Sequence, residues 1–203
     1  MSIATTAAPE TRIRNAALFL RRWAANPLQM GSVVPSSATL CRRIAGLVER
    51  RDDQVIVELG AGTGVISAAL LAAGVPPERL VVVEIVPEMA AYLRHALPGV
   101  TVVCGDAFAL PEVLPAALRG RVGDVICGIP LVLLPLEAQQ RFVQAVEAVA
   151  PGQGFLLYTY CITSPLPYRA LGLAAERKVW TIRNIPPASV WRYRPEEPAR
   201  TVR

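Results

Sequence analysis

The stretch Val55-Ile-Val-Glu58-Leu-Gly60-Ala-Gly62-Thr-Gly64 decides the fold of this chain. Its apolar first half predicts a buried strand, and its glycines predict a tight turn into a helix. Glycine suits such a turn because it adopts positive φ without steric cost and lets the backbone approach a ligand closely. A second apolar run begins at Leu80 and ends at Glu84. An acid about 20 residues after a glycine turn has the usual spacing for binding the hydroxyls of a ribose.

Together, the glycine turn and the two acids Glu58 and Glu84 resemble the first motifs of class I S-adenosylmethionine-dependent methyltransferases. The resemblance implies that Glu84 and the adjacent Ile85 bind the ribose of S-adenosylmethionine, whose product is S-adenosylhomocysteine. It also implies that three glycines pack against the amino acid part of this cofactor: Gly60, Gly62 and Gly64. The alternating glycines depart from the G-x-G-x-x-G spacing of nicotinamide-binding domains. Those domains, and a glycine turn that only joins a strand to a helix, are the alternatives.

Apolar strands alternate with helices over the central part of the chain, which predicts a mostly parallel sheet covered by helices on both faces. Two later strand-like runs, 177–183 and 188–194, predict an antiparallel hairpin at the sheet edge. The expected fold is therefore an α/β, Rossmann-like, seven-stranded sheet, and class I methyltransferases end their sheet with such a pair. The expected strands are 54–59, 80–84, 100–104, 122–127 and 154–160, and the expected helices are 64–73, 87–96, 111–119 and 135–149.

We expect one methyltransferase domain, 38–203, preceded by an N-terminal segment, 1–37, that holds an amphipathic helix and a cofactor-covering loop. Either Ser36 or Ser37 is suited to cap the helix that follows the loop and runs to about Arg50. The resemblance places both serines near the methionine part of the cofactor.

The carboxyl ends of the parallel strands meet at one edge of such a sheet, where ligands bind. Glu58 follows apolar residues, so we expect it to be buried, to order the glycine turn and to lie near the charged end of the cofactor. Asp106 follows the third strand and is placed to accept the adenine amino hydrogen, with Ala107 and Phe108 lining the ring. The alternative for Asp106 is a carboxylate that caps a turn.

The acceptor side departs from a familiar pattern. Amine-methylating relatives often carry an N-P-P-Y type motif after the fourth strand, whereas this chain has Gly128-Ile129-Pro130-Leu131. A backbone carbonyl around Ile129 and Pro130 can still accept from an amine, but no aromatic ring is present to stack on a base. Tyr160 is predicted to hold or relay the amine proton, and Tyr158 is a weaker candidate. Deprotonation by water, with both tyrosines serving only as packing residues, is the alternative.

Composition limits the function further. The net charge is +5, and 20 of the 21 basic residues are Arg, so an anionic partner or a codon bias toward Arg explains the excess. Mean hydropathy is +0.38, yet no run reaches the ~20 apolar residues of a membrane span. Cys104 and Cys127 end apolar runs and are expected in the core. Scattered cysteines and the single His95 predict no metal site.

A predicted helix over 11–25 carries apolar and aromatic side chains on one face and arginines on the other, which is typical of helices that lie in a membrane interface. A helix that docks on its own domain is the alternative. With the high hydropathy, this pattern predicts a cytoplasmic protein bound peripherally to the inner face of the membrane, with anionic lipids as partners. The residues assigned to membrane binding are Phe19, Leu20, Trp23, Arg14, Arg21 and Arg22.

From Phe19 through Pro195, the chain resembles bacterial phospholipid N-methyltransferases, which are similar to ribosomal RNA adenine dimethyltransferases. The segments that carry the resemblance are 26–37, 58–64, Glu84, 105–108 and 128–131. It implies methylation of phosphatidylethanolamine, through its mono- and dimethyl forms, to phosphatidylcholine, by a monomer without a nucleic acid partner. An RNA adenine methyltransferase and a cofactor-binding protein without catalysis are the rival hypotheses.

Overall fold

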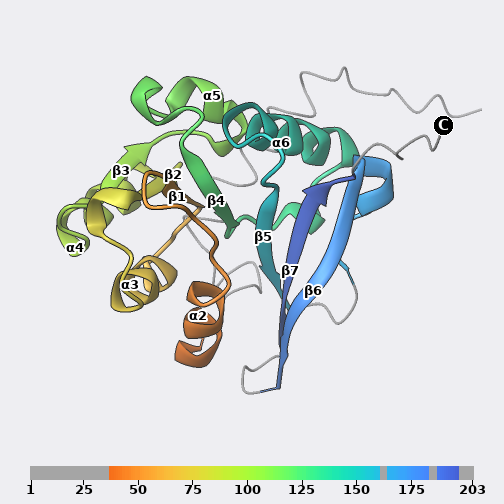
Figure 1. Cartoon of the computed structure of the whole chain (residues 1–203), viewed down its shortest axis with the longest axis horizontal. Helices are drawn as coiled ribbons and strands as arrows, with labels where there is room; N and C mark the ends of the chain where they lie inside the picture. The colour runs from red at the N-terminus through yellow and green to blue at the C-terminus, as the bar shows by residue number, and fades with distance from the viewer. Residues whose placement is uncertain (1–36, 161–163, 183–186, 197–203) are drawn as a thin grey trace, which may run out of the picture.

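The computed structural model describes residues 37–160, 164–182 and 187–196, and within them seven strands form one sheet in the order β3-β2-β1-β4-β5-β7-β6 (Figure 1). The first five strands run parallel, and β7 pairs antiparallel with both β5 and β6. The predicted Rossmann-like fold and its C-terminal antiparallel pair are thereby confirmed. The strands are β1 Val55–Leu59, β2 Leu80–Glu84, β3 Thr101–Cys104, β4 Val122–Cys127, β5 Phe155–Thr159, β6 Leu173–Thr181 and β7 Ala188–Pro195.

Helices cover both faces of the sheet, and each face has its own apolar core. One face packs against α2 (Ala38–Ala45), α3 (Val65–Ala72) and α4 (Pro87–Ala96). The other packs against α5 (Leu110–Val113) and α6 (Leu136–Val149). Short 3₁₀ turns complete the described elements: η1 Pro77–Arg79, η2 Ala107–Ala109, η3 Ala116–Leu118, η4 Leu131–Leu133 and η5 Tyr168–Leu171.

The central strands β1, β2 and β4 are buried along their whole length, which explains why they were readable as continuous apolar runs. Side chains alternate between the two cores: Val57 and Leu59 of β1 face α6, whereas Ile56 faces α2 and α3. All five parallel strands and three of the predicted helices begin and end within one residue of their expected positions.

Two helix predictions were wrong in extent. Helix α2 ends at Ala45, and Gly46 caps it, instead of running to Arg50. The backbone beyond it is diverted into tertiary contacts, because the Leu47 carbonyl and the Glu49 N–H bind side chains of distant strands. The predicted helix 111–119 is split into α5 and η3, since Pro115 lacks the N–H that a continuing helix needs.

Two edge features also differ from expectation. Strand β6 begins at Leu173, four residues before the predicted 177, because it pairs with β7 as far as Pro195. Cys104 is exposed, not part of the core, since β3 lies at the open edge of the sheet. Cys127, on the central strand β4, is fully buried as predicted.

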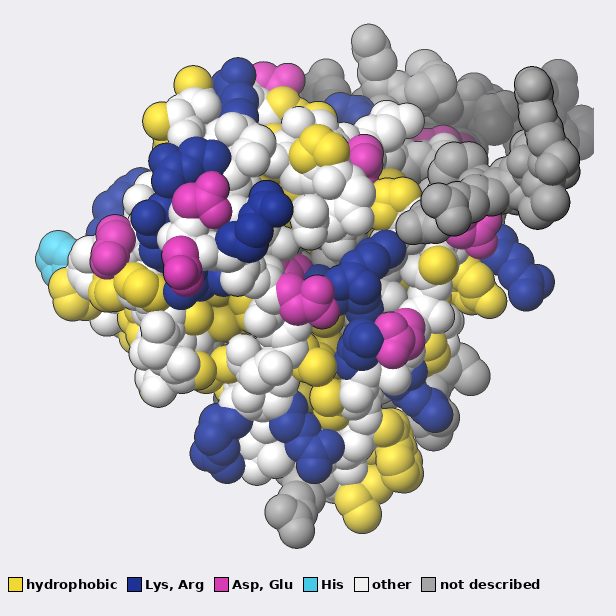
Figure 2. All heavy atoms as spheres, in the orientation of Figure 1, with side chains coloured by type: hydrophobic (Ala, Val, Ile, Leu, Met, Phe, Trp, Pro, Cys, Tyr) yellow, Lys and Arg dark blue, Asp and Glu magenta, His cyan; other side chains and the backbone are white. Residues whose placement is uncertain are grey.

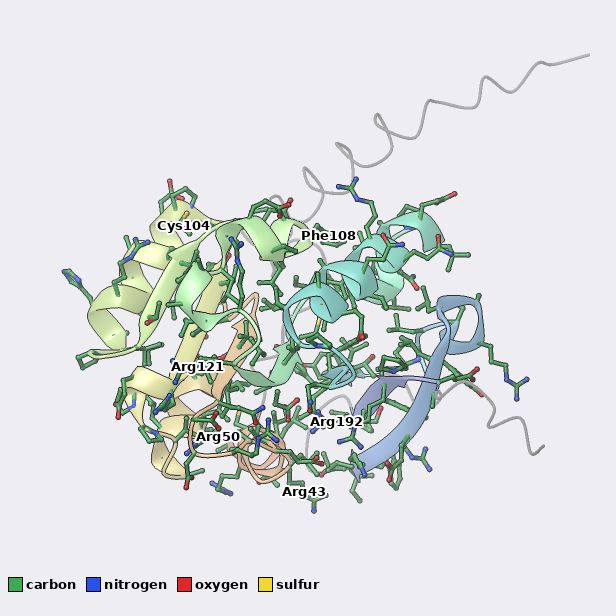
Figure 3. The ribbon with its side chains drawn as sticks, turned by 45° about the horizontal axis from the view of Figure 1, so that its top comes forward. Arg43, Arg50, Cys104, Phe108, Arg121 and Arg192 are labelled. Carbon is green, nitrogen blue, oxygen red and sulfur yellow. The ribbon has the colours of Figure 1, made fainter. Side chains whose placement is uncertain are left out.

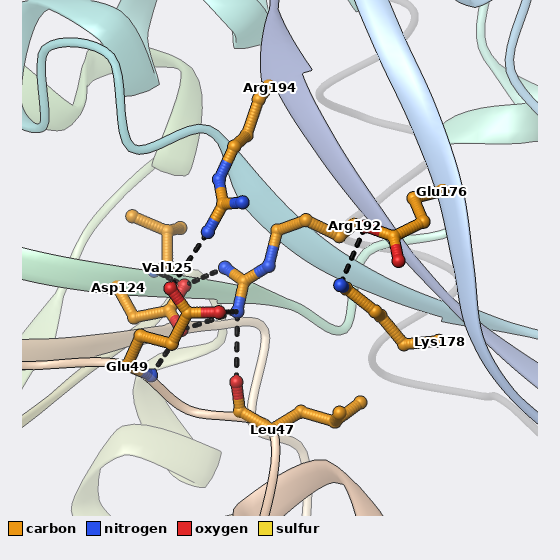
Figure 4. A network of polar contacts seen from close by, with 8 residues as sticks. All are labelled: Leu47, Glu49, Asp124, Val125, Glu176, Lys178, Arg192 and Arg194. Carbon is orange, nitrogen blue, oxygen red and sulfur yellow. Dashed lines mark hydrogen bonds and ion pairs between the residues drawn. The ribbon is translucent and has the colours of Figure 1, made fainter.

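A buried ion pair ties β7 to β4 at the end of the sheet opposite the glycine turn (Figure 4). The two terminal nitrogens of Arg192 donate to the two carboxylate oxygens of Asp124, and one of them also donates to the Leu47 carbonyl at 3.0 Å. Asp124 additionally accepts from the backbone N–H groups of Glu49 and Val125 at 3.0 and 2.9 Å. The pair therefore fixes the segment between α2 and β1 against the C-terminal strands.

Within the described residues, no helix is long and apolar enough to cross a membrane. The predicted amphipathic helix 11–25, its membrane-binding residues and Ser36 lie outside these residues, so their assignments stay predictions. Ser37 is described, and its hydroxyl accepts from the Leu40 N–H at 3.2 Å, which confirms it as the cap of α2.

Candidate active site

The glycine turn connects β1 to α3 at the carboxyl edge of the sheet. Its three glycines, Gly60, Gly62 and Gly64, all have positive φ, between 56° and 76°. A Cβ at Gly64 would lie 2.8 Å from the Leu93 side chain, so close packing against α4 also requires glycine there. A Cβ at Gly62 would meet nothing within 4 Å. The backbone at Gly62 therefore faces open space, which a cofactor can enter.

Glu84, at the end of β2, is buried and fixes this turn. One carboxylate oxygen accepts from the Gly62 N–H at 3.1 Å, and the other accepts from the Val86 N–H at 3.0 Å. A carboxylate oxygen has lone pairs beyond one hydrogen bond, so Glu84 retains capacity to bind a ligand hydroxyl. Ile85, directly after it, is half-buried at the same edge. Glu84, the residue predicted to bind the ribose, is therefore hydrogen-bonded to the glycine turn.

Glu58 lies on the α3 face of β1, and it is buried with a partner, as expected. The Ser67 hydroxyl on α3 donates to its carboxylate. Burial raises the pKa of the Glu58 carboxyl to about 7, the hydrogen bond from Ser67 opposes that rise, and the charge of Glu84 adds to it. Glu58 therefore titrates near neutral pH in the folded protein, unlike an exposed glutamate.

Gly128 follows β4 and packs between the ends of β1 and β5. Its N–H donates to the Leu59 carbonyl at 2.8 Å. A Cβ at Gly128 would lie 2.6 Å from the Gly60 carbonyl oxygen and 2.9 Å from the Tyr158 hydroxyl oxygen. The phenol of Tyr158 thus occupies the space into which a side chain at position 128 would project.

Tyr158 presents a protonated hydroxyl to this edge of the sheet. Its pKa is raised by burial first and by the negative charge of Glu58 second. No hydrogen bond joins the Tyr158 hydroxyl to another of the described residues. Tyr158 and Tyr160 pack on the same face of the sheet, as the alternation predicted, and both are half-buried.

The segment after Gly128 is held by its own backbone and by α6. The Ile129 carbonyl accepts from the Leu131 N–H at 2.8 Å, and the Pro130 carbonyl accepts from the Leu133 N–H at 3.0 Å. By contrast, no hydrogen bond to the Gly128 carbonyl is found among the described residues. This leaves the Gly128 carbonyl available at the edge where the predicted acceptor would enter.

Sequence comparison agrees with this geometry. Residues 56–154 match the sequence model of a family described as "Methyltransferase domain". The chain is 28% identical over 180 residues, 86% of its own length and 93% of the relative's, to an ornithine lipid N-methyltransferase from Singulisphaera acidiphila. The match to the methyltransferase family runs from Ile56 in β1 to the residue before β5. It therefore includes the carboxyl ends of β1, β2, β3 and β4 but not that of β5.

This protein is an S-adenosylmethionine-dependent methyltransferase. Two solved structures share the fold. One is 1,6-didemethyltoxoflavin-N1-methyltransferase from Burkholderia thailandensis, solved with S-adenosylhomocysteine bound, with a TM-score of 0.63 at 16% identity, covering 97% of this chain and 94% of that one. The other is a TehB-like methyltransferase from Corynebacterium glutamicum, with a TM-score of 0.54 at 15% identity, covering 93% and 100%.

In this methyltransferase the residues after β3, Asp106 to Phe108, make contacts within the fold itself. One oxygen of Asp106 accepts from the Phe108 N–H at 2.9 Å and caps η2, which confirms the capping role that was the alternative for Asp106. Ala107 is buried, and the Phe108 ring packs edge-on against Phe142 of α6 with centroids 5.8 Å apart. That these residues bind the adenine stays a prediction. The second carboxylate oxygen of Asp106 is compatible with it, because the capping bond uses only the first.

Sequence reasoning missed Gln139. Its side-chain nitrogen donates to the carbonyls of Leu131 and Leu134 at 3.1 and 2.9 Å, and so α6 holds the loop that follows Pro130. A polar residue on the otherwise apolar buried face of an amphipathic helix was the only signal.

Two of the described arginines lie away from the cofactor site. Arg50 and Arg121 flank the amino ends of β1 and β4, and Figure 3 shows them on the side of the molecule away from Cys104 and Phe108. Arg121 donates there to the Asp53 carbonyl, at 2.9 Å from its closer nitrogen.

Proposed function

We propose that this methyltransferase transfers methyl groups to the primary amine of a membrane lipid headgroup, with phosphatidylethanolamine as the predicted acceptor. The observation that carries the proposal is the similarity over 86% of the chain to a protein named as an ornithine lipid N-methyltransferase. Ornithine lipid and phosphatidylethanolamine both present a small primary amine on an amphiphile. The shared chemistry supports a lipid amine, and the choice between the two headgroups is the finer part of the proposal.

The site after β4 favours an acceptor without a flat ring. Leu131 stands where N-P-P-Y type enzymes have an aromatic residue, and it is buried in the core. Two exposed apolar residues follow it, Val132 and Leu133. This arrangement suits a small headgroup carried on acyl chains better than a stacked nucleobase.

The polar groups nearest the acceptor position are the Gly128 carbonyl and the Tyr158 hydroxyl. The carbonyl accepts from one amine N–H and the phenol oxygen accepts from the other, which leaves the nitrogen lone pair free and orients it. The cofactor supplies an electrophilic methyl group on its sulfonium. Each acceptor arrives as an ammonium and must lose one proton before transfer, so that its nitrogen lone pair can take the methyl group while the sulfur–carbon bond electrons stay with sulfur.

Ornithine lipid is the second candidate acceptor, favoured by the name of the relative. Its headgroup is an amino acid, with a carboxylate in place of the phosphate ester, so the two acceptors differ in the anionic group that accompanies the amine and not in net charge. Trimethylation of phosphatidylethanolamine to phosphatidylcholine, as the sequence resemblance implies, would require the site to admit mono- and dimethyl amines as well.

Label transfer from methyl-labelled S-adenosylmethionine tests the proposal. Vesicles of phosphatidylethanolamine, vesicles of ornithine lipid and unmethylated ribosomal RNA are offered in parallel. Label in either lipid supports a lipid amine acceptor and identifies the headgroup, and chromatography of the products counts the methyl groups added. Label in RNA alone would overturn the proposal in favour of the adenine methyltransferase.

Peripheral attachment to the membrane through residues 11–25 belongs to the same proposal. A variant without residues 1–25 should bind vesicles more weakly if that helix is an anchor. Unchanged vesicle binding would instead support a helix that packs on its own domain.

A further inference from the structure

Five exposed apolar side chains border the acceptor side of the site. We call Val132, Leu133, Leu136, Trp180 and Ile182 the apolar rim. The described part of the chain has seven large apolar side chains that are strongly exposed, and these are five of them. Leu133, Trp180 and Ile182 are 55%, 49% and 68% exposed. Such a concentration marks a surface that binds something, because isolated exposed apolar residues are scattered on ordinary surfaces.

Strand pairing places both halves of the apolar rim at the carboxyl edge of the sheet. Trp180 of β6 is opposite Ser189 of β7, which is opposite Thr159 at the end of β5. The tip of the β6–β7 hairpin therefore lies beside the end of β5, next to Tyr160. The other half follows Pro130 directly, at the end of β4. The two halves thus lie at the ends of β4 and β6, and the acceptor position, at Gly128 and Tyr158, lies at the ends of β4 and β5 on the same edge of the sheet.

Basic side chains accompany the hairpin half of the apolar rim. Arg42 and Arg43 on α2 are exposed, and Arg43 donates to the Trp180 carbonyl at 3.3 Å. Strand β6 also carries Arg177 and Lys178, of which Lys178 is paired with Glu176 at 2.6 Å, so the positive charge beside Trp180 comes mainly from α2. Figure 2 shows apolar side chains over the hairpin tip, with Lys and Arg side chains over the neighbouring α2. An exposed Trp and Ile beside arginines match the two layers of an anionic bilayer surface, its acyl boundary and its phosphates.

We propose that the apolar rim docks this enzyme onto the surface of an anionic lipid bilayer with the acceptor side of the site facing the headgroups. The inference rests on the proposed function, because a lipid amine can reach Gly128 and Tyr158 only if this edge meets the membrane. It adds a contact surface separate from residues 11–25. Insertion of Trp180, Ile182 and Leu133 removes apolar surface from water, and the arginines of α2 meet lipid phosphates.

Vesicle sedimentation of the full chain tests the docking surface without any substrate. The vesicles contain phosphatidylglycerol and phosphatidylcholine, and no lipid with a primary amine. The double variant Trp180→Ser/Ile182→Ser should lower the partition coefficient about tenfold, since each side chain loses the burial of a large apolar group. Leu133→Ser should lower it by a smaller factor. The matched control is Tyr92→Ser, which removes a 52% exposed side chain on α4, outside the apolar rim.

Vesicle binding of the double variant at the wild-type level would overturn the inference. A second copy of the chain bound to the apolar rim would also overturn it. Light scattering would then show a dimer for the wild type and a monomer for the double variant. The proposed function is read separately, from methyl transfer to a dispersed short-chain phosphatidylethanolamine or ornithine lipid. The double variant should retain that activity, whereas absence of label in any lipid with the wild type would reject the function and leave the vesicle result standing.

Discussion

The hydroxyl oxygen of Tyr158 lies 2.9 Å from the point where a Cβ of Gly128 would stand. In relatives with an N-P-P-Y type motif, an Asn side chain projects from the corresponding position. Here position 128 is a glycine and the phenol of Tyr158 on the next strand occupies that space, so a polar group is still present there. Under the proposed function, Tyr158 takes over the contact to the amine.

Tyr158→Phe should lower kcat about tenfold while leaving cofactor affinity unchanged, because it removes one hydrogen bond to the acceptor and no apolar packing. Steady-state methyl transfer and calorimetric titration with S-adenosylhomocysteine measure the two effects. Tyr160→Phe is the companion variant, since the sequence assigned the proton-handling role to Tyr160. A loss of kcat in that variant alone would return the role to Tyr160, and full activity of both would leave the backbone carbonyl as the sole contact to the amine.

Glu84→Ala should weaken S-adenosylmethionine binding by roughly 1.5–3 kcal/mol, as expected for charge-assisted hydrogen bonds to the ribose. The same change removes the acceptor of the Gly62 N–H, so part of the loss comes from the glycine turn. Glu84→Gln keeps one acceptor oxygen and should bind with intermediate affinity. Titration calorimetry measures all three proteins, and wild-type affinity in Glu84→Ala would show that the ribose lies elsewhere.

The pKa of Glu58 makes stability depend on pH. Its folded-state pKa, about 7, is above the ordinary value of 4.5, so the folded protein holds a proton that the unfolded chain has lost between these values. The free energy of unfolding should therefore fall as pH rises from 4.5 to 7, with a contribution from Glu58 of up to about 1.4 kcal/mol per pH unit. Above that range the contribution stays constant.

Urea unfolding of the cofactor-free protein across this range, compared with Glu58→Gln, isolates the effect. The glutamine cannot titrate, yet it can still accept from Ser67, so the difference in stability between the two proteins should change with pH. A difference that stays constant would mean that Glu58 titrates in the folded protein as it does in an exposed chain.

The sequence predicted the fold well because its evidence is local. Continuous apolar runs mark buried parallel strands, and the three glycines at positive φ mark the turn, so both follow from neighbouring residues. The end of α2 was missed because its cause is 145 residues away, where Arg192 binds the Leu47 carbonyl. The exposure of Cys104 depends on which strand forms the edge, which strand order alone decides.

The candidate site divides in the same way. Glu58, Glu84 and the glycines were predicted because they lie in one recognisable motif, and the structure brings them together through Gly62 and Ser67. The contact of Tyr158 with Gly128 and the contacts of Gln139 join different elements. No spacing along the chain encodes such pairs, so they become visible only when the strands are side by side.

Asp124→Asn should destabilise the fold by about 3–5 kcal/mol, because it removes the buried counter-charge of the Arg192 guanidinium and leaves only the exposed Glu49 carboxylate, 3.9 Å away. The loss belongs to the fold and not to the site, since the pair lies at the opposite end of the sheet from the glycine turn. Glu49→Gln is the matched control. It removes an exposed carboxylate that lies 2.8 Å from Arg194 and 3.9 Å from Arg192, while it keeps the Asp124 contact of Arg192, and should cost less than about 1 kcal/mol.

Urea denaturation at neutral pH compares the two variants with the wild type, and calorimetry at low temperature checks that folded Asp124→Asn still binds S-adenosylhomocysteine normally. Equal, small losses in both variants would mean that the desolvation of Arg192 and Asp124 cancels their attraction. Weakened cofactor binding in folded Asp124→Asn would mean that the ion pair also positions the carboxyl end of β4, and with it Gly128.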